Sequence, residues 1–207
     1  MQRTICGSVL LCGVLMTAAM TQAQQAHPYM LPWATSADVA VTYNLERAKI
    51  ASSNCGCFWM NGASAEGALN FRHNLGAVAL LGGAHASNIT PGVDLSKFTY
   101  LFGPRYSYDI SRYTDRYTRK HAAQIFGEAL FGGVHGFSSS FPAPSGVTSS
   151  ANSFAMQLGG GLDLALKKGF GVRALELDYV RTSLPNNTSN AQNDLRIAFG
   201  ASYHIGK

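Results

Sequence analysis

Residues 195–205 read Leu-Arg-Ile-Ala-Phe-Gly-Ala-Ser-Tyr-His-Ile, and an apolar or aromatic residue occupies every second position. Successive side chains of a β-strand point to opposite faces, so this stretch has one apolar face and one more polar face. A helical period of 3.6 residues would mix the two sets. The stretch therefore predicts a strand whose two faces meet different surroundings.

The same period of two continues backwards along the chain to residue 38. It predicts eight strands, at 38–47, 63–73, 75–85, 97–109, 118–134, 153–167, 171–181 and 194–206. Long polar or Gly/Pro/Ser/Asn-rich connections are expected near 48–62, 86–96, 135–152 and 182–193, with short turns between them near 73–74, 112–117 and 167–169. Short turns at one end and four long external loops at the other are typical of bacterial outer-membrane barrels. We therefore predict an all-β fold, a closed antiparallel up-and-down transmembrane barrel of about eight strands.

The composition agrees with a membrane protein that has no spanning helices. Of 207 residues, 46% are hydrophobic and only 13% are charged, whereas a soluble domain carries about 25% charged residues. A spanning helix needs roughly 20 consecutive apolar residues, and only the N-terminus approaches that. Strands in hydrocarbon must close into a barrel, because an open edge leaves backbone groups unpaired.

The positions of the charges favour a barrel over a soluble sandwich. If the more apolar face of each strand faces lipid, nine charged residues point inward: Glu46, Glu66, Arg72, Arg105, Glu128, Asp163, Glu176, Asp178 and Arg196. The other acids fall in loops or at strand ends: Asp38, Asp94, Asp109, Asp115 and Asp194. The interior of a barrel this small is filled by side chains. We therefore predict an interior network of ion pairs, including an Arg105–Glu128 contact, with a proton or ion path as the alternative.

The N-terminus is typical of an export signal. Arg3 precedes an apolar run over residues 5–20 and the small residue Ala23, which predicts a signal peptide at 1–23 cleaved after Ala23. A retained anchor helix is the alternative. Residues 24–37 are then a periplasmic segment and 38–207 the barrel. The expected location is the outer membrane of a Gram-negative-type bacterium.

Net charge and aromatic residues indicate a membrane surface. The formal charge is +5, but an exported chain rarely meets nucleic acid, so no nucleic-acid partner is expected. Basic residues collect at predicted turns, and aromatic residues share one face or lie near strand ends: Phe71, Tyr100, Phe102, Tyr106, Tyr108, Tyr179 and Tyr203. Such girdles lie at headgroup level. The expected partners are outer-membrane lipids and lipopolysaccharide.

Two cysteines follow the signal, Cys55 and Cys57. Two thiols are too few for an ordinary zinc site, and in an oxidising compartment they can form a disulfide. We expect a local bridge, with pairing between chains as an alternative.

No glycine cluster fits a phosphate-binding loop, so no cofactor and no metal are expected.

One short motif carries possible chemistry. His85-Ala-Ser-Asn88 resembles the His-x-Ser-Asn order of lipid A deacylases, which are themselves outer-membrane barrels. Such a site needs a serine nucleophile, a histidine base and an acid. The acid implied by the resemblance would lie near residues 96–100, where this chain has none, with only Asp94 nearby. No enzyme activity is expected; a lipid A-modifying hydrolase using His85 and Ser87 is the alternative.

Several segments together resemble the small outer-membrane β-barrel family related to the OmpA transmembrane domain and to OmpX: residues 54–58, 100–105, 129–133 and 159–163, with the last strand. The resemblance covers about residues 38–207 and implies the barrel fold. We expect a structural or surface-interaction role for this barrel, with a narrow passive pore for small solutes as a further alternative. Gly200, Tyr203 and Ile205 match the family's C-terminal assembly signal, which implies the barrel-assembly machinery as a partner. We expect a monomer and no peptidoglycan-binding domain.

Overall fold

The computed structural model describes residues 34–49, 56–90, 92–111, 123–144, 146–186 and 190–206. All of these residues belong to the unit of residues 33–207. The predicted signal peptide and most of the predicted periplasmic segment lie outside the described residues. So do Cys55 and the side chain of Arg72. The described part has no helix that is long and apolar enough to cross a membrane.

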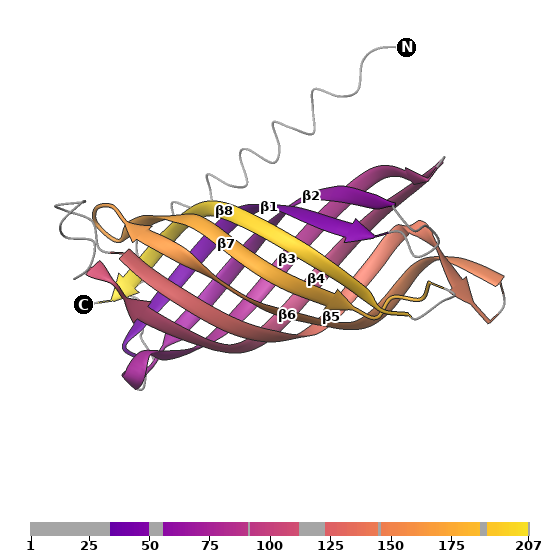
Figure 1. The fold of residues 1–207 in the computed structure, drawn as a ribbon. Helices are drawn as coiled ribbons and strands as arrows, with labels where there is room; N and C mark the ends of the chain where they lie inside the picture. Colours follow the sequence, from indigo (N-terminus) through magenta and orange to yellow (C-terminus); the bar gives the residue numbers. More distant parts are fainter. Residues whose placement is uncertain are drawn as a thin grey trace, which may run out of the picture. The chain divides into compact units, whose positions relative to one another are not determined.

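Eight strands form a single closed ring in chain order (Figure 1). They are β1 (Ser36–Lys49), β2 (Cys57–Asn70), β3 (Leu75–Thr90), β4 (Val93–Asp109), β5 (Ala123–Ala143), β6 (Gly146–Ala165), β7 (Phe170–Thr182) and β8 (Gln192–Gly206). Neighbours pair antiparallel, and β1 pairs with β8 to close the ring. Closure removes the exposed edges that an open sheet would present to lipid. The predicted fold class is confirmed.

Two of the expected external loops are wrong. Residues 86–96 and 135–152 are largely strand, because β3 runs to Thr90 and β4 begins at Val93, while β5 runs to Ala143 and β6 begins at Gly146. The Gly/Ser/Pro-rich composition suggested loops, but cross-strand pairing satisfies the backbone of these polar hairpins. In Figure 1 the β5–β6 hairpin projects beyond its neighbours at the end opposite the C-terminus.

The predicted short turn at 112–117 and the predicted start of the fifth strand at 118 lie outside the described residues. In the described part, β4 ends at Asp109 and β5 begins at Ala123. Because β3–β4 and β5–β6 form paired hairpins in place of two of the expected long loops, the expected strict alternation of long and short connections does not hold.

The outward face of the ring is apolar. The alternation of β1 is regular over its outer half, with Val41 and Tyr43 exposed and Thr42 and Asn44 buried. The exposed large side chains include Leu81, Phe98, Phe102, Phe131, Leu177 and Phe199. No acidic side chain interrupts this band among the described residues. A surface of this kind is stable against hydrocarbon and unfavourable in water.

A β-bulge interrupts the alternation in β7. Arg173 pairs with Asp163 and Leu175 pairs with Leu162, so Ala174 is an extra residue on this strand. Ala174 and Leu175 are both exposed, and the buried positions shift from Arg173 to Glu176. One extra residue in a strand moves every side chain beyond it to the opposite face of the sheet. Arg173 and Glu176 therefore both point into the barrel.

Candidate functional site in the charged interior

Arg173 is the centre of the interior network, and only 1% of its surface is exposed. Its guanidinium donates to both carboxylate oxygens of Glu66, at 2.9 and 3.0 Å, and to both of Asp163, at 2.9 and 3.1 Å. It also donates to Glu176 Oε2 at 2.9 Å. The planar fork of arginine suits bidentate pairing with carboxylates. One side chain thus joins β2, β6 and β7 across the lumen.

Arg105 forms the second half of this cluster. Its Nε donates to Glu128 Oε2 at 3.0 Å, and its terminal nitrogen lies 2.6 Å from Glu66 Oε1. Arg105 and Glu128 are directly opposite each other in the β4–β5 ladder. Phe126 lies beside both guanidinium groups, with its ring centre 4.0 Å from Arg105 Cζ and 4.4 Å from Arg173 Cζ. Such cation–π contacts contribute about 2 kcal/mol when desolvated.

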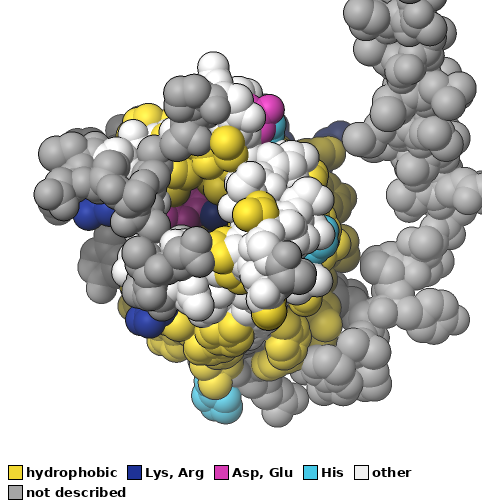
Figure 2. All heavy atoms as spheres, turned by 90° about the vertical axis from the view of Figure 1, so that its right-hand side faces the viewer, with side chains coloured by type: hydrophobic (Ala, Val, Ile, Leu, Met, Phe, Trp, Pro, Cys, Tyr) yellow, Lys and Arg dark blue, Asp and Glu magenta, His cyan; other side chains and the backbone are white. Residues whose placement is uncertain are grey.

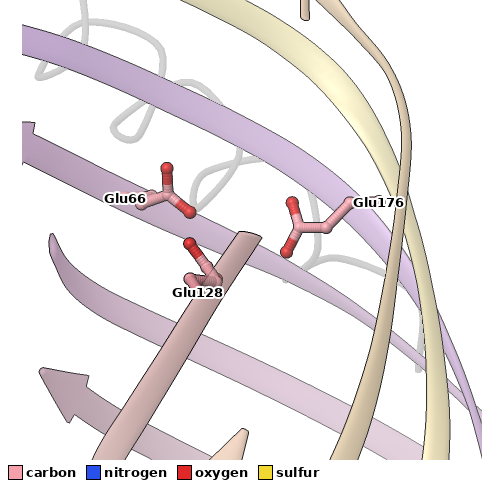
Figure 3. A group of neighbouring side chains, drawn as sticks. All are labelled: Glu66, Glu128 and Glu176. Atoms are coloured by element: carbon pink, nitrogen blue, oxygen red, sulfur yellow. The ribbon is translucent and has the colours of Figure 1, made fainter. Parts of the chain in front are cut away.

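Three glutamates converge from different strands in this region. Glu66, Glu128 and Glu176 point toward one another from β2, β5 and β7 (Figure 3), with ligand atoms within 4.8 Å of one another. Their oxygens are hydrogen-bonded to Arg105, Arg173 and Arg196. These guanidinium groups supply the positive charge that a cation would supply, so the cluster does not have the character of a metal site.

Arg196 extends the network toward β8. It donates to Glu176 Oε1 at 2.8 Å, to Asp178 Oδ2 at 2.7 Å and to Ser64 Oγ at 2.7 Å. Ser64 in turn contacts Thr42 Oγ1 at 2.7 Å. A charged group can stay in the interior only when such partners replace water.

A separate cluster surrounds Lys97. Its ammonium group pairs with Glu46 and lies 3.6 Å from Asp194 Oδ2, and all three side chains are nearly fully buried. Asp194 lies near the start of β8, as expected, but its side chain is buried and has the same inward parity as Arg196, so it belongs to the interior.

Eight of the nine predicted interior residues lie in the lumen or at its opening. Seven of them are buried, and Asp163 is half-buried where the lumen opens. Arg72 lies in the tight turn Arg72–Asn74, and its side chain is outside the described residues.

Sequence reasoning missed Lys97, Arg173 and Asp194. The parity that placed Arg105 inward also places Lys97 inward, and the parity of Arg196 does the same for Asp194. Arg173 has no such signal, since strict alternation from Glu176 assigns it to the lipid face. Only the bulge at Ala174 turns it inward.

Two cavities occupy different parts of the lumen. A small one of about 20 Å³ lies among Glu46, Ser64, Lys97, Gln157 and Arg196, which is room for about one water molecule. A larger one of about 250 Å³ lies at the C-terminal end of β8, among Asp38, Asp109, Asp163 and His204. They share no lining residue. Figure 2 shows the end that carries the β5–β6 hairpin, with a hollow that has acidic and basic side chains at its floor.

An apolar cluster occupies part of the interior next to the ion pairs. Its buried members include Val78, Leu80, Leu101, Leu130, Val134, Ala155, Phe141 and Leu184. Phe141 comes from the projecting part of β5 and Leu184 from the segment after β7, and both side chains lie against Gly136. Side chains from the hairpin thus fold back toward the lumen.

His85 and Ser87 do lie together, on the outward face of β3. His85 Nε2 is 3.1 Å from Ser87 Oγ, and His85 Nδ1 is 2.8 Å from Ser96 Oγ on β4. The hydroxyl group of Ser96 therefore lies against the histidine nitrogen that contacts an acid in a catalytic triad. Asp94 instead accepts from the backbone N–H of Asn88 at 2.9 Å. An uncharged hydroxyl stabilises the imidazolium that a hydrolase forms less than a carboxylate does.

We predict that Ser87→Ala leaves lipid A unchanged, because no carboxylate of the described residues contacts the His85–Ser87 pair. Mass spectrometry of lipid A from cells expressing the wild-type chain, the variant or neither checks this. The three spectra should be the same. Acyl loss that requires both His85 and Ser87 would contradict it.

The remaining predicted residues lie at strand ends or on the last strand. Cys57 begins β2 and is exposed; the proposed bridge to Cys55 stays a prediction. Gly200, Tyr203 and Ile205 all lie in β8. Tyr203 faces outward and packs edge-on against Phe170, with ring centres 4.8 Å apart.

A closed ring of eight strands with an apolar outside and a charged inside defines the class of small outer-membrane β-barrels. No family model matches the chain, and no curated protein matches it by sequence. Among solved structures, Ail, the attachment invasion locus protein of Yersinia pestis in complex with the heparin analogue sucrose octasulfate, has a TM-score of 0.50 at 14% identity, covering 83% of this chain and 99% of Ail. This likeness shows the fold alone.

Two further solved barrels match with lower scores. Neisserial surface protein A has a TM-score of 0.49 at 12% identity, with 83% of this chain and 97% of that chain covered. The N-terminal β-barrel domain of Pseudomonas aeruginosa OprF has a TM-score of 0.40 at 8% identity, with 81% and 97% covered.

Proposed function

We propose that this chain is an integral outer-membrane barrel with a structural or surface-interaction role and no catalytic activity. One observation carries the proposal: the polarity of the molecule is inverted, with ion pairs inside and aromatic and aliphatic side chains outside. In water this arrangement would expose the apolar band, whereas a bilayer covers it. The hairpins β3–β4 and β5–β6 then project from the outer surface, where a partner would meet them.

The outer rim suits phosphorylated outer-leaflet lipid. Tyr43 and Tyr179 donate to Asn61 and Asn193, at 3.0 and 2.6 Å, which places phenol groups at the boundary of the apolar band. Beyond this boundary, exposed basic side chains lie at the ends of β1 and β7: Arg47, Lys49 and Arg181. Cations at headgroup level attract phosphate. We assign these residues to contacts with lipopolysaccharide.

The barrel is a monomer inserted by the assembly machinery, according to this proposal. Every strand pairs on both sides within the ring, so no edge in the membrane requires a second chain. The last strand supplies the Gly200, Tyr203 and Ile205 signal for insertion.

The lumen does not conduct in this proposal. The ion pairs of Arg105, Arg173 and Arg196 and the apolar cluster around Leu101 and Leu130 fill it. The two cavities on either side share no lining residue. A narrow passive pore would need a continuous wet path through these groups.

We expect the purified chain to show β-rich circular dichroism in micelles and to migrate differently on gels before and after boiling, because only the folded barrel resists detergent. Added to a planar lipid bilayer, it should leave the conductance at the level of a boiled sample. A helix-dominated spectrum would end the barrel proposal. Steady conductance steps from the folded sample alone would instead favour the pore.

A further inference from the structure

We infer that the barrel interior binds two protons at neutral pH, one on each of two buried acid pairs. The first observation is an imbalance of charge. The ion-pair network described above contains four basic side chains, Lys97, Arg105, Arg173 and Arg196, and seven acidic ones, Glu46, Glu66, Glu128, Asp163, Glu176, Asp178 and Asp194. If every group were ionised, the net charge would be 4 − 7 = −3. Uncompensated charge in a closed interior is costly, and carboxyl groups avoid it by taking up protons.

The first pair is Glu176 and Asp178, on the same face of β7. Arg196 Nη1 donates to both, at 2.8 and 2.7 Å, so one cation serves two acids. Two ionised carboxylates held this close to one nitrogen repel each other, and a proton on one of them removes that repulsion. Arg173 pairs with Glu176, while Glu128 on β5 adds negative charge nearby.

Asp178 is the member that carries the proton. Its Oδ1 is buried and has no hydrogen-bond partner, whereas both oxygens of Glu176 accept from arginine. Oδ1 lies against the backbone of Gly159 on β6, at the place that a Cβ atom there would occupy.

The second pair is Glu46 and Asp194, which meet from β1 and β8 beside Lys97 of β4. Lys97 pairs with Glu46 and lies farther from Asp194, at 3.6 Å. One ammonium group therefore serves both carboxyl groups, as Arg196 does in the first pair. Asp194 Oδ1 is the second buried carboxyl oxygen without a partner in the described part of the chain. Arg196 lies directly opposite Glu46 in the β1–β8 ladder and is a further cation beside this carboxyl group.

Three acids exceed the four basic side chains, and the third of them, Asp163, stays ionised. Asp163 is the most accessible acid of the network, with 17% of its side chain exposed, and it borders the larger cavity. Both of its oxygens accept from Arg173. Solvent at this mouth screens its charge. The interior therefore holds two protons, which resembles the sharing of one proton between paired carboxylates in other buried acid pairs.

Amide substitutions distinguish the protonated member of each pair from the ionised member. Asparagine resembles a protonated aspartic acid, so Asp178→Asn and Asp194→Asn should leave the urea unfolding midpoint of the full-length barrel in micelles nearly unchanged. The matched variants Glu176→Gln and Glu46→Gln remove the ionised member and should lower the midpoint clearly. Equal losses within a pair would overturn the inference.

Infrared spectroscopy of the wild-type barrel gives a readout that does not depend on any variant folding. At neutral pH it should show the C=O stretching band of protonated carboxylic acid, and each Asp→Asn variant should lose about half of it. Unfolding in urea at neutral pH should release about two protons per chain, since exposed carboxyl groups ionise near pH 4. A wild-type spectrum without the acid band would show that the interior is fully ionised.

Discussion

Arg173→Ala is expected to destabilise the barrel more than the loss of any other interior charge. Removing one partner of a buried ion pair costs about 3–5 kcal/mol, because the other charge stays buried without compensation. Arg173 pairs with three acids, Glu66, Asp163 and Glu176. Glu66 and Glu176 keep Arg105 and Arg196 as partners, but Asp163 loses the one arginine with which it pairs in the described part of the chain, and the contact of Arg173 with Phe126 is lost as well. We therefore expect a loss at or above the top of that range.

The measurement is urea unfolding of the refolded protein in micelles, followed by the gel shift between folded and unfolded forms. Arg181→Ala is the matched control, because Arg181 lies on the same strand with an exposed side chain at the outer rim. Surface substitutions of this kind change stability by about 0.5 kcal/mol or less. If the two variants unfold at the same urea concentration, the bulge at Ala174 does not turn Arg173 inward.

The second large effect is expected at Arg105 and Glu128. Arg105→Ala leaves the carboxylate of Glu128 buried without its arginine partner and removes one of the two arginines that pair with Glu66. The free energy of unfolding should therefore fall by about 3–5 kcal/mol. Glu128→Ala should cost less, because Arg105 keeps Glu66 as a partner at 2.6 Å. The double variant should lose less than the sum of the single losses, with a coupling of about 1–3 kcal/mol.

A double-mutant cycle from the four unfolding curves measures this coupling. Arg47→Ala combined with Glu128→Ala is a suitable control pair, since Arg47 is exposed at the outer end of β1. That pair should be additive. A coupling near zero for Arg105 and Glu128 would mean that their contact contributes nothing beyond filling space.

Alternation along the chain was sufficient to predict the number of strands, their order and the face on which most charged residues lie. Glu46, Glu66, Arg105, Glu128 and Arg196 were assigned to the interior from parity alone, and the structure places them there. Strand ends were predicted less well. Ser, Gly and Pro near 135–152 are common in loops, yet β5 and β6 continue as a paired hairpin because each strand satisfies the other's backbone.

The sequence by itself therefore determined the class of fold and the polarity of each strand, because the period of two is a local property of consecutive side chains. Only the tertiary structure decided which charges meet. Arg173 and Glu66 are 107 positions apart, and they meet because the ring closes and a single extra residue in β7 turns Arg173 into the lumen. Closure and register depend on neighbouring strands, so a pattern read along one strand does not contain them.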